Sequence, residues 1–336
     1  MNVRHAIRSL YRAARPRPKS HAVVLMYHRV AECDLDPWKL CVSPRRFGEQ
    51  LESLMREYRI LPLHDLARAE AGGKAVAITF DDGYADNLHA AAPALAQHGA
   101  PACFFLTSGA LDMPREFWWD ELERLLLHED GLPPAIEVSV GSQRVFEPGR
   151  AAEPVTDLRQ QVRANPPWKA GPRTRLGFFY AVWQALRVLN EHDRHVALRE
   201  IATQIAGDGG TRASHRSMTR EEALRLAGMP GVQIGAHSVT HAVLPALAPE
   251  MQSAEIRDSK GQLEELLGRP VTGFAYPFGD YGPATAELVR QAGFEWACTT
   301  ESGGVNRHTD PFRMPRMAVE DCDGRQLVQQ IHGLLG

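Results

Sequence analysis

Short apolar runs alternate with amphipathic stretches along most of this chain. The apolar runs have the length and composition of buried strands, and the stretches between them repeat apolar residues at helical spacing. We expect strands at 22–27, 75–80, 102–106, 232–236, 273–276 and 296–299, and helices at 44–56, 87–98, 249–267, 283–292 and 325–335. Repeated strand and helix units of this kind predict an α/β fold with a mostly parallel sheet.

Residue chemistry marks several of the helix boundaries. Pro44 follows a serine, which is typical of the first turn of a helix. Thr219 stands three residues before Glu222, the spacing of a capping box. Gly99 and Gly268 stand directly after helical patterns, where a left-handed residue commonly ends a helix. These signals place the helices between the strands and support the alternating order.

Polar residues follow two of the predicted strands. Asp81, Asp82 and Gly83 come directly after one strand, and His237 and His241 come after another. The carboxyl ends of parallel strands are where α/β folds expose functional groups. One carboxylate and two imidazoles can hold a divalent metal ion, while a second carboxylate stays free to take a proton from water. The sequence therefore predicts a hydrolytic metal site with positions open to water and substrate.

The spacing within each motif suggests how its side chains converge. His237 and His241 are four apart, so a helical turn after the strand would put both rings on one face. A turn opened by Gly83 would bring both carboxylates to one cavity, with Asp82 the leading candidate for the third ligand. Taken alone, a sequence such as Asp-Asp-Gly is more often a simple turn. The two motifs together, each after a strand, favour a site.

Composition and charge exclude some classes of protein. The chain has 336 residues, is 44% hydrophobic and has a net charge of −3, which suits a large α/β domain and argues against binding nucleic acid. No apolar run reaches the roughly 18 residues of a membrane span, and the first twenty residues lack the apolar core of a signal peptide. Five scattered cysteines do not make a disulfide framework. We expect Cys103 and Cys298 to be buried thiols and the protein to be cytoplasmic.

The N-terminal segment is strongly basic. Residues 1–19 contain six Lys or Arg and no acidic residue, and Ile7, Leu10, Tyr11 and Ala14 fall at helical spacing. An interfacial helix attracted to anionic lipid would show this pattern, so peripheral contact with the inner face of the membrane is one expectation. A weakly ordered basic tail is the other.

Two motifs resemble those of a known family. Residues 79–83 (TFDDG) and 237–241 (HSVTH) are similar to the first and second motifs of the polysaccharide deacetylases, which form carbohydrate esterase family 4 and share the nodulation-factor deacetylase domain. The resemblance covers residues 22–111 and 218–318. It implies a distorted, incomplete (β/α) barrel and metal-dependent removal of N-acetyl groups from amino sugars.

The resemblance also assigns roles to individual residues. It implies that Asp81 is the general base and that Asp82, His237 and His241 are the metal ligands. Zinc is the first expectation for the metal, with cobalt, nickel or iron as alternatives for this donor set.

A third motif lies at residues 274–279. By resemblance, Tyr276, Pro277, Phe278 and Gly279 contact the substrate, and the N–H of Phe278 helps to hold the oxyanion. Common family members carry an arginine where this chain has Ala275. That arginine orients the base in those relatives, so the residue that orients Asp81 is left open here.

Two histidines are candidates for the general acid that protonates the departing amine. The first strand ends in Met26, Tyr27 and His28, and this resembles the branch that deacetylates poly-N-acetylglucosamine, in which a histidine after the first strand is the acid. We prefer His28 on that ground. The alternative is His332, which stands in a C-terminal sequence similar to the motif of commoner relatives. An amphipathic terminal helix with a solvated histidine explains His332 equally simply.

The two metal-binding motifs are farther apart than is usual in this family. The resemblance therefore divides the chain into a basic segment (1–20), a deacetylase domain (21–111 and 218–336) and a largely helical insertion (112–217) of about a hundred residues.

The insertion has two predicted amphipathic helices, at 117–127 and 178–189. Trp118 and Trp119 have two interpretations, as a wall on which sugars stack or as anchors of the insertion to the barrel. The insertion as a whole is a candidate lid or substrate-sizing element.

The combined prediction is a metal-dependent carbohydrate N-deacetylase that acts on a bacterial polysaccharide or its precursor. The expected partner is a glycan or glycan precursor, and no oligomeric state is assigned. One alternative is a deacylase or deformylase of a small or lipid-linked sugar, which a cytoplasmic location would favour. Another is a non-catalytic glycan-binding protein, which would be expected to have lost Asp81 or a metal ligand.

Overall fold

The structure is a computed structural model and describes residues 20–68, 74–128, 132–133, 136, 139–140, 143–144, 155–205 and 210–335. The basic segment predicted at 1–20 lies outside the described residues except for Ser20, and so does its predicted membrane contact. Among the helices that the structure describes, none is long and apolar enough to cross a membrane.

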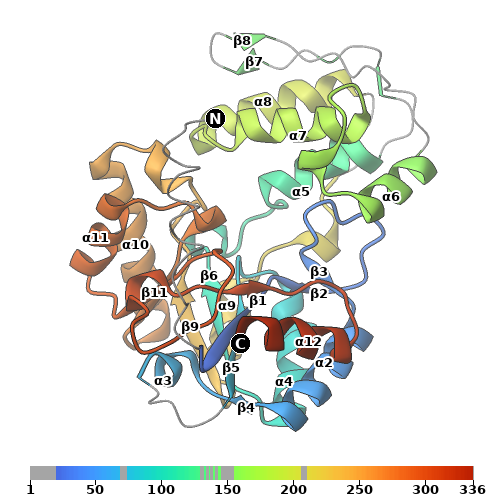
Figure 1. Cartoon of the computed structure of the whole chain (residues 1–336). Coiled ribbons are helices and arrows are strands. Elements are labelled where there is room, and N and C mark those ends of the chain that lie inside the picture. The colour runs from blue at the N-terminus through green and yellow to red at the C-terminus, as the bar shows by residue number, and fades with distance from the viewer. Residues whose placement is uncertain are drawn as a thin grey trace, which may run out of the picture.

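Parallel strands form one curved sheet at the centre of the molecule (Figure 1). The strand order is β11-β10-β9-β6-β5-β1-β12, and β4 pairs with β5 beside this path. The strands of the sheet are β1 (Ala22–Tyr27), β4 (Arg59–Ile60), β5 (Ala75–Phe80), β6 (Ala102–Leu106), β9 (Val232–Ala236), β10 (Gly273–Ala275), β11 (Trp296–Cys298) and β12 (Met317–Ala318). Two short pairs lie outside it, β2 (Arg29–Val30) with β3 (Cys41–Val42) and β7 (Ser139–Val140) with β8 (Gln143–Arg144). With its helices the curled sheet is the incomplete (β/α) barrel that the sequence predicted.

Helices cover the outer face of the curved sheet, with α10 and α11 at the left of the view in Figure 1 and α2, α4 and α12 at the right. The helices of the barrel are α2 (Pro44–Glu57), α3 (Leu63–Arg68), α4 (Ala92–His98), α9 (Arg220–Ala227), α10 (Pro249–Leu267), α11 (Pro283–Gln291) and α12 (Gly324–Leu335). Those between β6 and α9 are α5 (Trp118–Glu123), α6 (Val155–Ala164), α7 (Arg175–Leu186) and α8 (Glu191–Gln204). Short π- or 3-10-helical turns are η1 (Asn87–Ala91), η2 (Ser108–Ala110), η3 (Arg124–His128), η4 (Pro167–Lys169), η5 (Ala213–His215), η6 (Leu244–Ala246), η7 (Pro277–Gly279) and η8 (Pro311–Arg313).

The predicted helix boundaries are confirmed where residue chemistry defined them. Thr219 and Glu222 form both hydrogen bonds of a capping box at the start of α9. Gly99 and Gly268 adopt left-handed conformations with φ of 62° and 63° at the ends of α4 and α10. The helix predicted at 87–98 begins instead as the π-helical turn η1 and continues as α4.

The region predicted as an insertion contains more helix than the sequence indicated. The helix expected at 117–127 is divided into α5 and the π-helical turn η3, and the one expected at 178–189 is α7. The helices α6 and α8 were not predicted. Figure 1 shows α5, α7 and α8 beyond the end of the sheet where the carboxyl ends of the strands lie.

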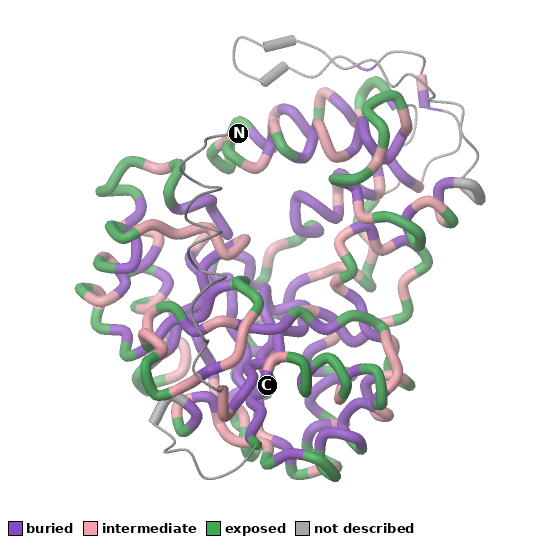
Figure 2. The backbone as a smooth tube through the Cα atoms, viewed as in Figure 1, coloured by how far each residue is buried: buried purple, intermediate pink, exposed green. Residues whose placement is uncertain are grey.

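Two large apolar clusters meet near this end of the sheet. One is built from the strands and the surrounding barrel helices, and β1, β5, β6, β10 and β11 are buried along their length (Figure 2). The other is built from α5, α6, α7 and α8, and it takes in Tyr84 from the loop after β5, with Phe278 of η7 packed against it. The loops after β5 and β10 therefore lie between two cores, which holds their backbones in place.

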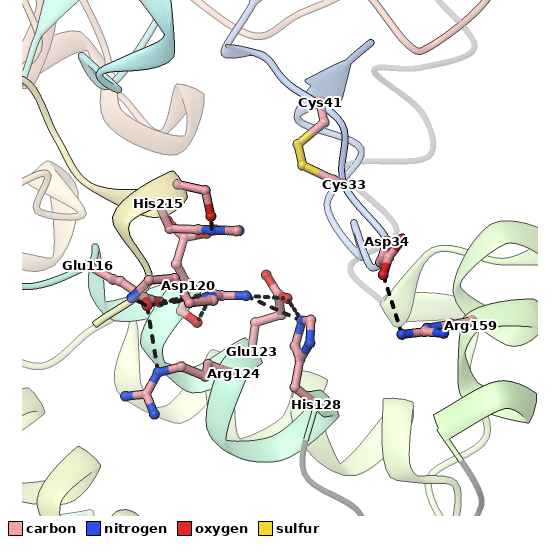
Figure 3. A network of polar contacts seen from close by, with 12 residues as sticks. Cys33, Asp34, Cys41, Glu116, Asp120, Glu123, Arg124, His128, Arg159 and His215 are labelled. Carbon is pink, nitrogen blue, oxygen red and sulfur yellow. Dashed lines mark hydrogen bonds and ion pairs between the residues drawn. A yellow bond between two sulfur atoms is a disulfide. The ribbon is translucent and has the colours of Figure 1, made fainter. Parts of the chain in front are cut away.

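One pair of cysteines departs from the sequence interpretation. Cys33 and Cys41 form a disulfide that closes the loop before β3 (Figure 3). The prediction for the other two was correct, because Cys103 and Cys298 are free and buried. Burial raises the pKa of the Cys298 thiol to about 12, so it stays protonated at neutral pH.

Candidate active site

The parallel sheet brings the two predicted motifs together. Asp81 and Asp82 follow β5, and His237 follows β9, so all three stand at the carboxyl ends of strands in one sheet. The N–H of Asp81 donates to Tyr27 O at the end of β1, and the N–H of His237 donates to Leu106 O at the end of β6 (3.0 and 2.9 Å). These backbone bonds fix the positions from which the side chains project.

Left-handed backbone conformations determine the directions in which the site's side chains point. The helical turn that was predicted after β9 is not present, so that prediction was wrong. The segment from His237 to His241 is a bend, in which Ser238 and His241 have φ of 61° and 54°. Asp82 has φ of 74° and is the centre of a tight turn closed by the N–H of Gly83 on Asp81 O (3.0 Å). Positive φ costs energy in non-glycine residues and concentrates at functional sites.

Three buried side chains converge on one point. The Oδ1 atom of Asp82 lies 3.4 Å from Nε2 of His237 and 3.2 Å from Nε2 of His241. The ligand atoms of this trio all lie within 4.8 Å of one another, as a single metal ion requires. The structure therefore assembles the donor set that was predicted from the two motifs.

The hydrogen bonds around these residues fit a bound cation. His237 Nδ1 lies 2.8 Å from Ala275 O, so it carries the proton that it donates and leaves the lone pair of Nε2 facing Asp82. Asp82 Oδ1 has no hydrogen-bond partner within the described part of the chain. Burial lowers the pKa of His237, but the Asp82 and Asp81 carboxylates outweigh it and raise that pKa above the usual value. The two carboxylates therefore favour positive charge at this point, and a divalent metal ion would supply it.

Asp81 is held by an arginine that the sequence interpretation missed. Arg316 precedes β12 and donates from both terminal nitrogens to the two Asp81 oxygens, at 2.7 and 2.6 Å. Its Nε donates to Thr299 O (2.9 Å), and Nη1 also reaches Thr79 Oγ1 (3.1 Å). Burial alone would raise the pKa of Asp81, but the guanidinium outweighs it and holds that pKa below its ordinary value. Asp81 is therefore ionised and fixed in orientation at neutral pH.

A signal for Arg316 is visible in the sequence. It is the single charged residue in the apolar run Met314 to Val319, where a strand pattern would otherwise place an apolar side chain. A buried arginine needs a carboxylate partner. In this chain, which has Ala275 where an arginine was expected, the arginine that contacts Asp81 comes instead from the residue just before β12.

His28 lies beside the two aspartates. It directly follows Tyr27, whose carbonyl accepts the Asp81 N–H. Burial lowers the pKa of His28, while the nearby Asp82 and Asp81 carboxylates act in the opposite direction. His332, in contrast, is exposed on α12, and its ring contact is with Tyr58 at 5.8 Å between centroids. The structure thus brings His28 to the predicted site and places His332 on the surface of a helix.

The third motif divides into buried and site-facing residues. Tyr276 is fully buried, and its hydroxyl donates to Phe312 O (3.1 Å), so its side chain belongs to the core. Pro277 is buried and begins η7. Phe278 has φ of 58°, and its ring lies 4.4 Å from that of His241 between centroids.

Gly279 allows η7 to pass close to a neighbouring loop. It has φ of 71°, and a Cβ at this position would lie 1.9 Å from Thr300 Oγ1. Only glycine is compatible with both the conformation and the close approach.

Trp119, one of the two tryptophans of α5, contacts the barrel at the site. Both are buried, and the ring of Trp119 lies 4.6 Å from that of His241 between centroids. This contact supports the anchoring interpretation for Trp119, whereas the ring contacts of Trp118 are with residues of α5, α7 and α8. A cavity of about 110 Å³ lies beside the two tryptophans, lined in part by Trp118, Trp119, Arg194 and Thr240. Stacking of a sugar on this wall stays a prediction.

A second group with metal-ligand geometry is less suited to a cation. Asp120, Glu123 and His215 present ligand atoms within 4.8 Å of one another. Burial raises the pKa of Asp120 well above its usual range, and burial with the guanidiniums of Arg29 and Arg212 lowers the pKa of His215 to about 2. Arg212 already pairs with Glu123 at 3.3 Å. The group belongs to a network of ion pairs (Figure 3).

Comparison with known protein families identifies the two segments that carry the motifs. The family model for polysaccharide deacetylase matches residues 68–130 and 180–297 of this chain. The matched segments include Asp81, Asp82, His237 and His241. A comparison with curated proteins gives no match.

Solved structures with the same fold are similar over nearly the whole chain. The deacetylase PplD of Streptococcus pyogenes in complex with acetate has a TM-score of 0.57 and 17% identity, covering 94% of this chain and 99% of that one. IcaB from Ammonifex degensii has a TM-score of 0.57 and 18% identity, covering 93% and 97%. A de-N-acetylase from Aggregatibacter actinomycetemcomitans has a TM-score of 0.55 and 13% identity, covering 92% and 99%. At these identities the likeness shows the fold alone.

Proposed function

This chain belongs to the polysaccharide deacetylase family, and from that premise we propose that it hydrolyses the N-acetyl group of an amino sugar in a bacterial polysaccharide or its precursor, using a bound divalent metal ion. Family membership supports a hydrolytic carbohydrate deacetylase. The metal dependence, the class of sugar and the roles of individual residues are proposed in addition.

The convergence of Asp82, His237 and His241 beside a separately clamped Asp81 is the observation that carries the proposal. The first three present oxygen and nitrogen atoms to one point, whereas both oxygens of Asp81 are paired with the guanidinium of Arg316. One carboxylate is thus reserved for the metal and the other for proton transfer. A glycan-binding protein without catalysis has no need of this division, which counts against that alternative.

The residues of the chain divide the work of amide hydrolysis. A divalent ion held by Asp82, His237 and His241 would supply Lewis acidity, which lowers the pKa of water and polarises the acetyl carbonyl. Asp81 takes the proton from the attacking water, and His28 gives a proton to the departing amine.

The backbone N–H of Phe278, a residue whose ring lies beside that of His241, donates to the developing oxyanion. The expected products are acetate and a sugar with a free amine.

The proposal is tested by measuring acetate release and metal content on the same preparation. Oligomers of N-acetylglucosamine and a lipid-linked N-acetylamino sugar serve as alternative substrates. The lipid-linked sugar tests the alternative that the enzyme acts on a small or lipid-linked sugar. We expect about one Zn²⁺ per chain and loss of acetate release on chelation, restored by Zn²⁺. Full activity of the chelated protein, or no release of acetate or formate from any substrate, would show the proposal to be wrong.

The cellular location stays a proposal. The sequence predicts a cytoplasmic protein, peripheral at the membrane through residues 1–19. The Cys33–Cys41 disulfide counts against the cytoplasm, because such bonds persist mainly in oxidising compartments. Alkylation of free thiols in intact cells, followed by measurement of the protein's mass, distinguishes a cytoplasmic from an oxidising location. Cys33 would be alkylated in the cytoplasm, and it would be protected as a disulfide in an oxidising compartment.

A further inference from the structure

The two histidines of the candidate metal site are held in different ways. His237 is oriented by a hydrogen bond from Nδ1 to Ala275 O (2.8 Å). His241 Nδ1 is buried and has no hydrogen-bond partner among the residues that the structure describes. Metal-binding histidines usually donate their second ring nitrogen to a fixed acceptor. The orientation of His241 must therefore come from packing.

Aromatic rings from two segments enclose His241. The ring of Trp119 is tilted against the imidazole of His241, with 4.6 Å between centroids and an interplanar angle of 54°. Phe278 contacts it at 4.4 Å with an angle of 78°. Phe278 belongs to the third motif of the barrel, whereas Trp119 comes from α5, which stands between β6 and α9. Part of the support for His241 thus comes from the predicted insertion.

A buried hydrogen-bond relay fixes the indole of Trp119. Its Nε1–H donates to the hydroxyl of Tyr84 (2.8 Å), and that hydroxyl donates to Asp120 Oδ2 (2.7 Å). Tyr84 follows Asp82 by two residues, so the relay ties α5 to the same loop that supplies the metal-binding carboxylate. The guanidinium of Arg29 lies over the Tyr84 ring, 4.6 Å from its centroid, and packs against this residue of the relay.

Ion pairs fix α5 and its preceding loop in turn. Arg212 donates to both Glu116 oxygens, at 2.8 Å from Nη2 to Oε2, and to Glu123 (3.3 Å). Glu116 precedes α5 and Glu123 is its last residue, and Figure 3 shows them on the same side as Asp120. The helix that carries Trp119 is therefore anchored just before its first residue, at Asp120 within it and at its last residue.

From these contacts we propose that Trp119, held by Tyr84 and Asp120, is a positioning residue that orients His241 for metal binding. The site is then incomplete without α5. The indole restricts rotation of the imidazole about its Cβ–Cγ bond, and this keeps Nε2 directed at Asp82 Oδ1, 3.2 Å away. The inference rests on the proposed metal-dependent function, and it extends that function by assigning part of the metal site to the predicted insertion.

The chain offers a matched control. Trp118 precedes Trp119 on the same helix and is equally buried, with 5% and 4% of each residue exposed. Trp118 contacts Trp119, Trp183 and Arg194, and its Nε1 has no hydrogen-bond partner in the described part of the chain. Loss of either indole leaves a comparable gap in the same cluster, but only Trp119 touches His241.

The test measures Zn²⁺ affinity of the full chain by competition with a chromogenic chelator, together with kcat and KM for acetate release at saturating Zn²⁺. Trp119→Leu should bind Zn²⁺ about 10–100-fold more weakly, the usual effect of losing a group that orients a ligand. Trp118→Leu should bind Zn²⁺ as the wild type does. Tyr84→Phe and Trp119→Phe remove the relay but keep a ring, so each should have an intermediate effect on affinity. For each variant, a thermal unfolding curve verifies folding.

The outcomes separate this inference from the proposed function. Equal weakening by Trp118→Leu and Trp119→Leu would show that the indoles matter only for packing, and unchanged affinity in Trp119→Leu would overturn the positioning role. If Trp119→Leu does not fold, wild-type affinity in both Tyr84→Phe and Trp119→Phe overturns it. A wild-type chain without Zn²⁺ affinity would instead contradict the proposed function itself.

Discussion

Replacing Arg316 by methionine should move the acid limb of the activity profile to higher pH. In the wild type the guanidinium holds the pKa of the buried Asp81 below its ordinary value of 3.8, against the effect of burial. Without that cation, burial is opposed only by weaker influences and the pKa rises. A cation this close lowers a carboxyl pKa by about 1–3 units, so the midpoint of the acid limb should move to higher pH by about the same amount in the variant.

The stability of the variant should fall in a defined pH range. A carboxyl group with a lowered pKa stabilises the fold above the pKa of the unfolded chain, and the contribution is lost as pH falls through the folded pKa. Removing one partner of a buried ion pair leaves an uncompensated charge, which costs about 3–5 kcal/mol in the free energy of unfolding. Arg316→Met should therefore be least stable at neutral and alkaline pH, and acidification should reduce its deficit relative to the wild type.

The assay is kcat/KM for acetate release across the acidic and neutral range at saturating Zn²⁺, with urea unfolding at two pH values. Arg316→Lys keeps the charge but loses the two-pronged contact, so its shift should be smaller. Arg45→Met removes an exposed partner of Glu49 on α2 and should change neither measurement. An acid limb that stays in place in Arg316→Met would refute the assignment of Asp81 as the base held by Arg316.

Two further comparisons test the residue roles. Asp81→Asn should keep the metal and lose about 10²-fold or more in kcat, the scale of a general base, whereas Asp82→Ala should lose the metal, as inductively coupled plasma mass spectrometry of both variants can check. If Asp81→Asn empties the site, the two roles are reversed. His28→Ala should suppress turnover and remove the alkaline limb of the pH profile without loss of metal, while His332→Ala should retain activity. The opposite result for the two histidine variants would assign the acid to the C-terminal helix.

Local sequence patterns were sufficient for the candidate ligands and for the longer strands of the sheet, but not for its two-residue strands β4 and β12. Burial of alternate or continuous apolar residues defines the strands, and the polar residues directly after β5 and β9 must emerge at one end of a parallel sheet. The sequence alone was therefore enough to group Asp82, His237 and His241 as candidate ligands of one site. The two cap glycines and the capping box were equally local, because each depends on backbone chemistry within one turn.

The details of the site were decided by contacts between distant parts of the chain. Arg316 and Asp81 are 235 residues apart, and no periodicity relates them. The bend at Ser238 and His241 replaced the predicted helical turn because neighbouring segments stabilise conformations that these residues do not prefer.

Trp119 reaches His241 only because the two apolar clusters meet there. Sequence patterns encode which residues are buried and which are available for chemistry. Long-range packing, which depends on the path of the whole chain, decided which charge faces Asp81 and which ring orients His241.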